Sequence, residues 1–115
     1  MYVDDEIINL QLFKINFSEE FEVLTAENGM EGIEVLNSNH DTAVVVSDMK
    51  MPGMNGIEFI KKSKVIFPEI SYFILTGYEI TNEIQEALNC GLIIKYFRKP
   101  INVFEFKSEI KLALK

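Results

Sequence analysis

The sequence predicts an α/β fold in which five strands alternate with five helices and form one parallel sheet covered by helices on both faces. Of the 115 residues, 48% are hydrophobic and three are proline, which is enough to bury the core of one domain. The runs TAVVVS at 42–47 and ISYFIL at 70–75 are typical of strands buried on both faces. Segments with helical spacing separate the strands, and right-handed crossovers then make the sheet doubly wound.

Each expected element has a local signal in the chain. The segment FEVLT alternates with a period of two, which predicts the second strand. A turn at Asn28-Gly29 precedes the second helix, and Pro68 ends the third. Gly91 is expected as the C-cap of the fourth helix, and Asn102 as the N-cap of the last. The expected strands are residues 1–4, 21–25, 42–47, 70–75 and 92–97, and the expected helices are residues 5–17, 30–37, 57–67, 80–89 and 102–115.

Composition excludes several classes of protein. The net charge of −7 disfavours direct nucleic-acid binding, because phosphate backbones attract basic surfaces. A single cysteine excludes an intrachain disulfide framework and a cysteine-based zinc cluster. The longest uninterrupted hydrophobic runs are far shorter than the roughly 20 residues that cross a membrane, and no secretory signal is visible at the start. We therefore expect a cytoplasmic setting without membrane contact.

Polar side chains follow four of the five expected strands at their carboxyl ends, the edge where doubly wound sheets bind ligands. They are Asp4, Asp5 and Glu6 after the first strand, Asp48 after the third, Thr76 after the fourth and Lys99 after the fifth. Clustered carboxylates repel one another unless a cation lies between them, and a set of oxygen ligands suits Mg²⁺. A lysine beside such an ion makes a site for an anionic group. Together with a free carboxylate, this arrangement indicates phosphoryl transfer.

Four segments at these strand ends carry a resemblance to a known family. They are VDDE at 3–6, VSDMKMPGMNG at 46–56, LTG at 75–77 and YFRKP at 96–100. Each segment alone is weak, but all four occur in order and each stands at a strand end. The chain resembles the receiver domain of two-component response regulators, in particular the chemotaxis regulators, over essentially its whole length. The resemblance implies a flavodoxin-like sheet of order 2-1-3-4-5, with residues 1–115 as one receiver domain.

The resemblance also implies a phosphorelay signalling domain rather than an enzyme, since it catalyses only its own phosphorylation and dephosphorylation. Asp48 matches the phosphoacceptor, which attacks a phosphohistidine of a partner. Asp5 matches the acid that binds Mg²⁺ directly, and Asp4 the acid that acts through a bound water. The backbone carbonyl of Lys50 matches the remaining protein ligand, besides Asp48 itself. Mn²⁺ is the alternative ion.

Three further residues match the parts that respond to phosphorylation. Lys99 matches the lysine that contacts the phosphoryl group, and the following bond to Pro100 is cis in the family. Thr76 matches the switch hydroxyl, and Tyr96 matches the switch aromatic. The phosphoryl group biases a pre-existing equilibrium between two arrangements of these residues. Lys50 and Tyr78 are expected to flank the pocket and to slow self-hydrolysis.

The implied partners follow from the same resemblance. A sensor histidine kinase or a phosphotransfer protein supplies the phosphoryl group. The readout face consists of the fourth helix, the fifth strand and the fifth helix, and it controls an output domain, a partner protein or a homodimer. Mixed charge suits such docking. The charged residues expected on this face are Lys95, Arg98, Lys107, Lys111, Glu105 and Glu109.

Three other functions stay open on the residues alone. A Mg²⁺-dependent phosphatase could use an aspartyl phosphate, although its Asp-x-Asp pattern is absent after the first strand. A flavin carrier would need a phosphate loop where Asp4-Asp5-Glu6 stands, and an interaction module would signal without phosphate. One departure from the resemblance concerns the first strand, which has only three residues before the acids. We expect a few residues of this strand to precede Met1 in the natural protein.

Overall fold

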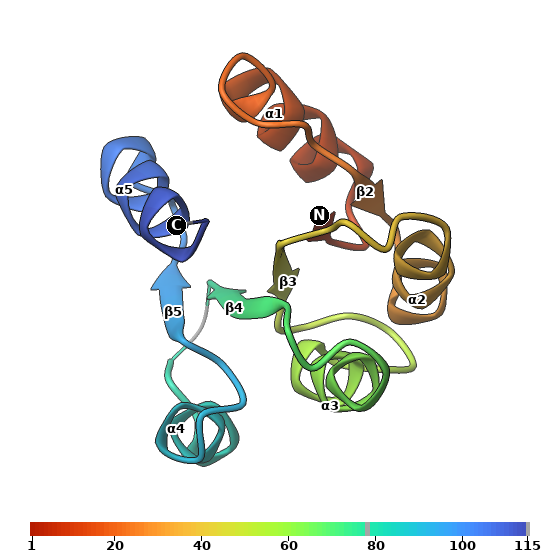
Figure 1. Cartoon of the computed structure of the whole chain (residues 1–115). Coiled ribbons are helices and arrows are strands. Elements are labelled where there is room, and N and C mark those ends of the chain that lie inside the picture. Colours follow the sequence, from red (N-terminus) through yellow and green to blue (C-terminus); the bar gives the residue numbers. More distant parts are fainter. Residues whose placement is uncertain (78, 115) are drawn as a thin grey trace.

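The computed structural model describes residues 1–77 and 79–114 and contains one sheet of five parallel strands in the order β2-β1-β3-β4-β5 (Figure 1). The expected fold class and strand order are confirmed. The strands are β1 (Tyr2–Val3), β2 (Thr25–Ala26), β3 (Val44–Asp48), β4 (Ser71–Thr76) and β5 (Lys95–Arg98). The helices are α1 (Ile7–Phe17), α2 (Gly29–Ser38), α3 (Gly56–Ile66), α4 (Asn82–Asn89) and α5 (Val103–Ala113).

The sheet separates two hydrophobic layers. Helices α1 and α5 cover one face, and α2, α3 and α4 cover the other (Figure 1). Alternate residues of the central strands supply the two layers: Val45 and Ile74 pack toward α2–α4, whereas Val46 and Phe73 pack toward α1 and α5. Because β3 and β4 are buried on both faces, they read as nearly continuous hydrophobic runs.

Two strands begin three or more residues later than the sequence predicted, and each difference has a physical cause. Strand β2 pairs only with β1, which has two residues, so the ladder extends over Thr25 and Ala26 rather than over 21–25. Strand β5 begins at Lys95 rather than at 92, because the amides of Leu92 and Ile93 donate hydrogen bonds to the carbonyl of Ala87 and close the end of α4. Both predictions placed hydrophobic residues correctly near the sheet but assigned the backbone pairing wrongly.

The start of α3 is tied closely to the end of β3. The Asn55 side chain accepts a hydrogen bond from the Glu58 amide, and the Glu58 side chain accepts one from the Asn55 amide, which makes a capping box. Gly56 follows, and a Cβ atom there would collide with the carbonyl oxygen of Asp48 and with the side chain of Ile74. Only glycine lets the helix begin this close to Asp48.

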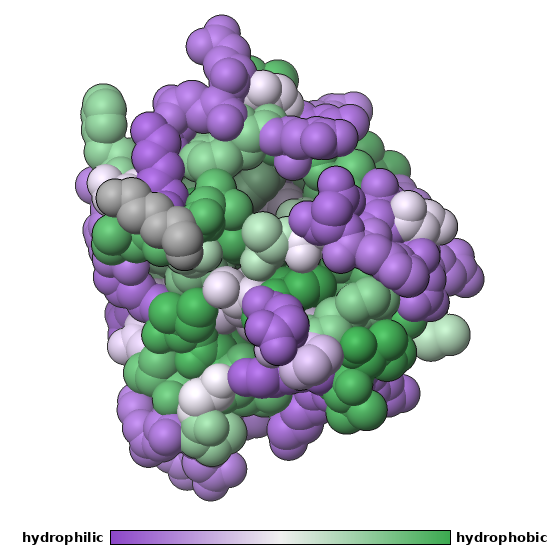
Figure 2. All heavy atoms as spheres, in the orientation of Figure 1, coloured by the Kyte–Doolittle hydropathy of each residue, from purple (hydrophilic) through white to green (hydrophobic). Residues whose placement is uncertain are grey.

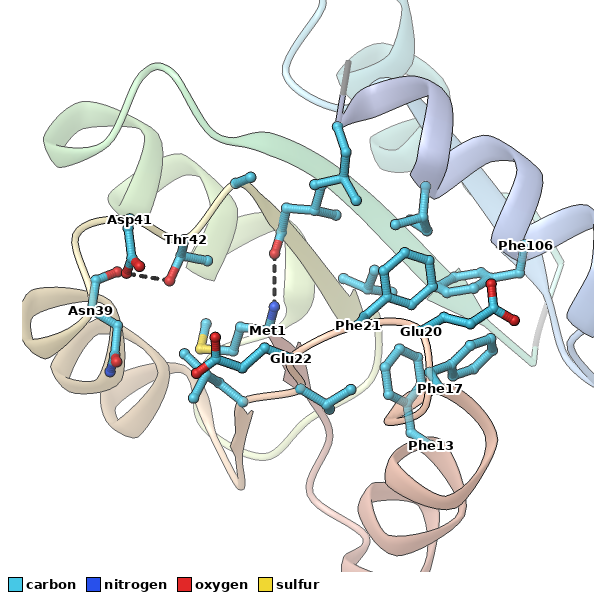
Figure 3. Close-up of a pocket in the computed structure, with 17 residues that line it drawn as sticks. Met1, Phe13, Phe17, Glu20, Phe21, Glu22, Asn39, Asp41, Thr42 and Phe106 are labelled. Atoms are coloured by element: carbon cyan, nitrogen blue, oxygen red, sulfur yellow. Dashed lines mark hydrogen bonds between the residues drawn. The ribbon is translucent and has the colours of Figure 1, made fainter.

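A groove lies at the amino edge of the sheet, where β1 begins. It has a volume of about 370 Å³ and lies between residues 20–24 and 41–44, with Phe13, Phe17 and Phe106 at one side (Figure 3). The ammonium group of Met1 donates a hydrogen bond of 2.7 Å to the carbonyl of Val44 within this groove (Figure 3). Figure 2 shows hydrophobic side chains around the hollow centre of this face, with hydrophilic ones along its margins. The groove therefore continues the line of β1 beyond Met1.

Candidate functional site

Three aspartates meet at the carboxyl edge of the sheet. Asp4 and Asp5 follow β1, and Asp48 is the last residue of β3. Each of the three offers a carboxylate oxygen, and these oxygens all lie within 4.8 Å of one another. Asp4 is fully buried and Asp48 is 7% exposed, whereas Asp5 is open to solvent. We call these three residues the acid cluster. The sequence predicted that they would lie together, and the structure brings them together.

Lys99 lies against the acid cluster from the segment after β5. Its Nζ atom is 3.0 Å from Oδ1 of Asp48 and 3.5 Å from Oδ2 of Asp4. The Lys99 amide donates a hydrogen bond of 2.8 Å to the carbonyl of Thr76, which anchors the segment to the end of β4. The peptide bond between Lys99 and Pro100 is cis, as the resemblance implied.

The electrostatics of the site follow from burial and crowding. Burial raises the pKa of the Asp48 carboxyl, and the nearby negative charge of Asp4 adds to this, while the hydrogen bond from Lys99 opposes it. Burial alone would lower the pKa of Lys99, but its hydrogen bond and charge interaction with Asp48 outweigh that effect and raise it. Lys99 is therefore a firmly protonated cation, and Asp48 is a carboxylate in a crowded acidic environment.

Two residues near Asp4 were not found from the sequence. The Tyr2 hydroxyl donates a hydrogen bond of 2.5 Å to Oδ2 of Asp4, and the Asn9 side-chain amide donates one of 3.1 Å to the same oxygen. The amide of Glu6 donates to Oδ1 at 3.0 Å. The two-residue period of a strand, which places Tyr2 on the same side of β1 as Asp4, was a usable signal for Tyr2. The contact between Asn9 and Asp4 depends on how α1 packs against the end of β1, which the sequence does not reveal.

An open pocket of about 620 Å³ gives access to the acid cluster. It is lined by Asp5, Glu6, Asp48, Lys50, Met51, Pro52, Gly77 and Lys99. Lys50 is exposed at its rim, and Thr76 is 2% exposed at the end of β4, beside a second small pocket that contains Gly77 and Lys99. The structure thus places Thr76 and Lys50 around the acid cluster, as the sequence predicted. Tyr78 lies outside the described residues.

Tyr96 has a different environment. It is half-buried on β5, packs against the hydrophobic layer under α4, and lines a separate groove with Leu88, Pro100 and Asn102. It therefore belongs to the side of the sheet that carries α4, away from the pocket over the acid cluster.

The charges expected on the face of α4, β5 and α5 are divided between two places. Lys95 on β5 lies 3.6 Å from Glu105 and 3.2 Å from Glu109. Lys107 and Lys111, however, both form ion pairs with Glu20, at 2.6 and 2.8 Å. Because these lysines are four residues apart, they lie on the same side of α5, the side that faces the end of α1. They were wrongly assigned to the face beside β5.

The donor set of the acid cluster fits a hard divalent cation. All three side chains offer carboxylate oxygens, the ligands that Mg²⁺ prefers, and the exposed Asp5 and the open pocket leave room for the water molecules that this ion retains. Among the described residues, no helix is long and apolar enough to cross a membrane.

The fold and the acid cluster define a class of protein: a doubly wound α/β domain with an acidic, cation-compatible site at the carboxyl edge of its sheet. A family model described as the response regulator receiver domain matches residues 1–111. The chain belongs to this family of two-component signalling domains.

Individual relatives agree with this assignment. The chain is 32% identical to sporulation initiation phosphotransferase F of Bacillus subtilis, over 99% of this chain and 91% of the relative. A response regulator receiver domain protein from Clostridium thermocellum has a crystal structure with a TM-score of 0.85 and 31% identity, covering 97% of this chain and 90% of that one. The response regulator TrrA from Thermotoga maritima, in complex with Mg²⁺-BeF, has a TM-score of 0.82 and 28% identity, covering 97% and 95%.

Proposed function

We propose that Asp48 accepts a phosphoryl group from a phosphohistidine of a sensor kinase or phosphotransfer protein. A carboxylate oxygen of Asp48 forms the new P–O bond while the P–N bond of phosphohistidine breaks, and the imidazole, whose other ring nitrogen carries a proton, keeps the electron pair of the broken bond and leaves as the neutral ring. The observation that carries this proposal is the convergence of Asp4, Asp5 and Asp48 with Lys99 under one open pocket. Family membership supports it, because receiver domains act in phosphorelay signalling.

We assign Mg²⁺ to the acid cluster as part of the same proposal. Asp5 and Asp48 would hold the ion directly, Asp4 would act through a water molecule, and the backbone carbonyl of Lys50 would add a ligand. When bound, the ion supplies positive charge that offsets the charge of the transferring group. The carboxylates suit Mn²⁺ as well as Mg²⁺. We assign Mg²⁺ because a receiver-domain neighbour was crystallised with it.

Lys99 supplies a second, fixed positive charge beside Asp48. Its amine lies 3.0 Å from the proposed acceptor and stays protonated, so it is placed to stabilise charge on the phosphoryl oxygens. Such pre-positioned charge is usually the largest single contribution to catalysis of this kind. Lys99 also holds Asp48 while no phosphoryl group is present.

The proposed output is a change in the face formed by α4, β5 and α5. Thr76 would move toward a phosphoryl oxygen, and the half-buried Tyr96 would turn inward beneath α4. Lys95 and its partners Glu105 and Glu109 give this face charges of both signs, which suits a homodimer, an output domain or a separate partner protein. The chain acts here as a signalling switch rather than a classical enzyme, in the cytoplasm, where kinases draw on ATP.

The domain organisation completes the proposal. Residues 1–115 make one receiver domain, and the groove at the amino edge would accept strand residues added ahead of Met1. The two-residue β1 pairs with β2, which also has two residues, and with β3, which has five, and Met1 lines the groove at its amino end.

The test of the proposed chemistry is the intact mass of the chain after incubation with acetyl phosphate and Mg²⁺. We expect a Mg²⁺-dependent gain of one phosphoryl group, about 80 Da, in the wild-type chain and no gain in Asp48→Asn. Asp41→Asn is a matched control, because Asp41 is exposed at the opposite edge of the sheet. A gain that persists in Asp48→Asn would contradict the assignment of the acceptor.

A further inference from the structure

Tyr2 is a buried tyrosine whose hydroxyl contacts Asp4 of the acid cluster. Its side chain is 2% exposed, and its hydroxyl donates a hydrogen bond of 2.5 Å to Oδ2 of Asp4. Burial raises the pKa of Tyr2 far above its usual value, and the hydrogen bond to Asp4 adds to this, so the phenol stays protonated and acts as a donor. A hydrophobic residue would fill this strand position equally well, but it would leave Asp4 without this donor.

Aromatic packing holds the Tyr2 ring in place. The ring stacks on Phe13, with centroids 4.3 Å apart and an angle of 16° between the planes. Phe13 in turn contacts Phe17 and Phe106, at centroid distances of 4.6 and 5.6 Å. The ring therefore has little freedom, and the position of its hydroxyl is determined by β1, α1 and α5 together. A donor fixed in this way restricts the carboxylate that accepts from it.

The two oxygens of Asp4 differ in the number of donors they accept. Oδ2 accepts from Tyr2 and Asn9 and lies 3.5 Å from the amine of Lys99, whereas Oδ1 accepts from the Glu6 amide. A carboxylate oxygen offers about two acceptor sites. Oδ2 is therefore saturated, and Oδ1 retains acceptor capacity for an ion or for one of its water molecules.

We infer that Tyr2 is a positioning residue of the metal site, and that its hydroxyl holds Asp4 so that Oδ1 is presented to a water molecule of a divalent cation. This inference rests on the proposed function, because it requires the acid cluster to bind Mg²⁺. It assigns to β1 a task besides placing the two aspartates that follow it. Outer partners of metal ligands commonly change metal affinity by about 10- to 100-fold when they are removed.

The test compares Tyr2→Phe with a matched variant, Tyr72→Phe. Tyr72 is also buried, at 1% exposed, and its hydroxyl donates a 2.9 Å hydrogen bond to the carbonyl of Phe67, which is not part of the site. Each variant loses one buried hydroxyl and keeps its ring. The Mg²⁺ dissociation constant would be measured by titrating backbone amide NMR signals, which also report whether the variant is folded. We expect about tenfold weaker binding in Tyr2→Phe and unchanged binding in Tyr72→Phe.

A second measurement uses the wild-type chain and avoids the risk of an unfolded variant. With ¹³C-labelled tyrosine, the Cζ signal of Tyr2 should shift with the same Mg²⁺ dependence as the amides near the acid cluster. The Cζ signal of Tyr72 should stay in place. A Tyr2 signal that does not respond, or equal dissociation constants for wild type and Tyr2→Phe, would overturn the inference. A wild-type chain that does not bind Mg²⁺ at all would instead contradict the metal site of the proposed function.

Discussion

At the carboxyl end of β1, the buried carboxylate of Asp4 accepts hydrogen bonds from three neighbours and lies beside the cation of Lys99. At the amino end of the same strand, the ammonium of Met1 donates a hydrogen bond to the carbonyl of Val44 and lies beside a largely hydrophobic groove. Burial lowers the pKa of that ammonium from 8.0 to about 6.

The comparison shows two ways in which a fold treats a buried charge. Burying a charge is unfavourable unless partners compensate it. At the acid cluster the fold supplies compensation from several elements, because hydrogen-bond donors and the cation of Lys99 surround the buried carboxylate of Asp4. At the groove there is little compensation, and burial favours the neutral form of the Met1 amino group by lowering its pKa. We expect the first charge to be needed for function and the second to be removable without loss.

The largest expected effect comes from removing the compensation at the acid cluster. In Lys99→Met, phosphorylation of Asp48 by acetyl phosphate should slow by about 100-fold, because a pre-positioned charge beside the acceptor is lost. Mg²⁺ should bind several-fold more tightly, since three carboxylates then lack their neighbouring cation. The time course of the phosphorylated mass measures the first effect, and amide NMR titration measures the second.

Lys95→Met is the matched control for this change. Lys95 also pairs with two acids, Glu105 and Glu109, but on the face of β5 and α5. Both its phosphorylation rate and its Mg²⁺ affinity should stay close to the wild-type values. If Lys99→Met weakened Mg²⁺ binding, the expectation that the positive charge of Lys99 opposes cation binding at the three carboxylates would be wrong.

The second effect concerns the groove. Adding Val-Ile-Val before Met1 should lengthen β1, bury hydrophobic side chains in the groove and raise the free energy of unfolding by about 1.5–3 kcal/mol. Each added residue contributes about 0.5–1 kcal/mol, the difference between roughly 1.5–3 kcal/mol for burying its side chain and about 1–2 kcal/mol for ordering it. Urea unfolding monitored by circular dichroism measures it.

A Gly-Ser-Gly extension of equal length separates groove filling from simple lengthening. It also removes the ammonium from its place beside Val44, but it offers no side chain that could fill the groove. Equal unfolding midpoints for the two extended chains would contradict the proposal that strand residues belong there.

The smallest effect is the pH dependence of stability that arises from the Met1 ammonium. Its pKa is about 6 in the folded chain and 8.0 in the unfolded chain, so the unfolded chain binds more protons between these values. Stability of the chain that begins at Met1 should therefore rise by about 2 kcal/mol from pH 6 to pH 8, and fall as the pH is lowered through this range. Thermal unfolding at several pH values measures the slope.

Acetylation of the same amino group is the control for this titration. The acetylated chain has no group that titrates there, so the contribution of Met1 should vanish while other contributions remain. Parallel pH profiles for the free and acetylated chains would show that burial does not shift this group as described.

The sequence predicted the fold class, the strand order and the residues of the acid cluster, because all three depend on short segments with strong local signals. The carboxyl ends of parallel strands must share one edge, which brings Asp4, Asp48, Thr76 and Lys99 together in any doubly wound sheet. The bounds of β2 were not predictable, since they depend on the length of β1 rather than on FEVLT itself.

The sequence also could not predict which side chains of different helices and strands contact one another. Lys107 and Lys111 bind Glu20 because of the rotation of α5 relative to α1, which spacing along α5 does not define. The same holds for Asn9 and Asp4, which meet only because α1 packs back against the end of β1.

The close approach of Gly56 to Asp48 has a consequence for how this chain tolerates mutation. The Gly56 amide donates a 2.9 Å hydrogen bond to the carbonyl of Met49, and the space where a methyl group would stand is taken by the carbonyl of Asp48. A random change from glycine to alanine would therefore displace the backbone that carries Asp48, without altering a single charged or hydroxyl group. A library of variants selected for signalling should show one intolerant position in the first turn of α3, at a residue with no functional group of its own.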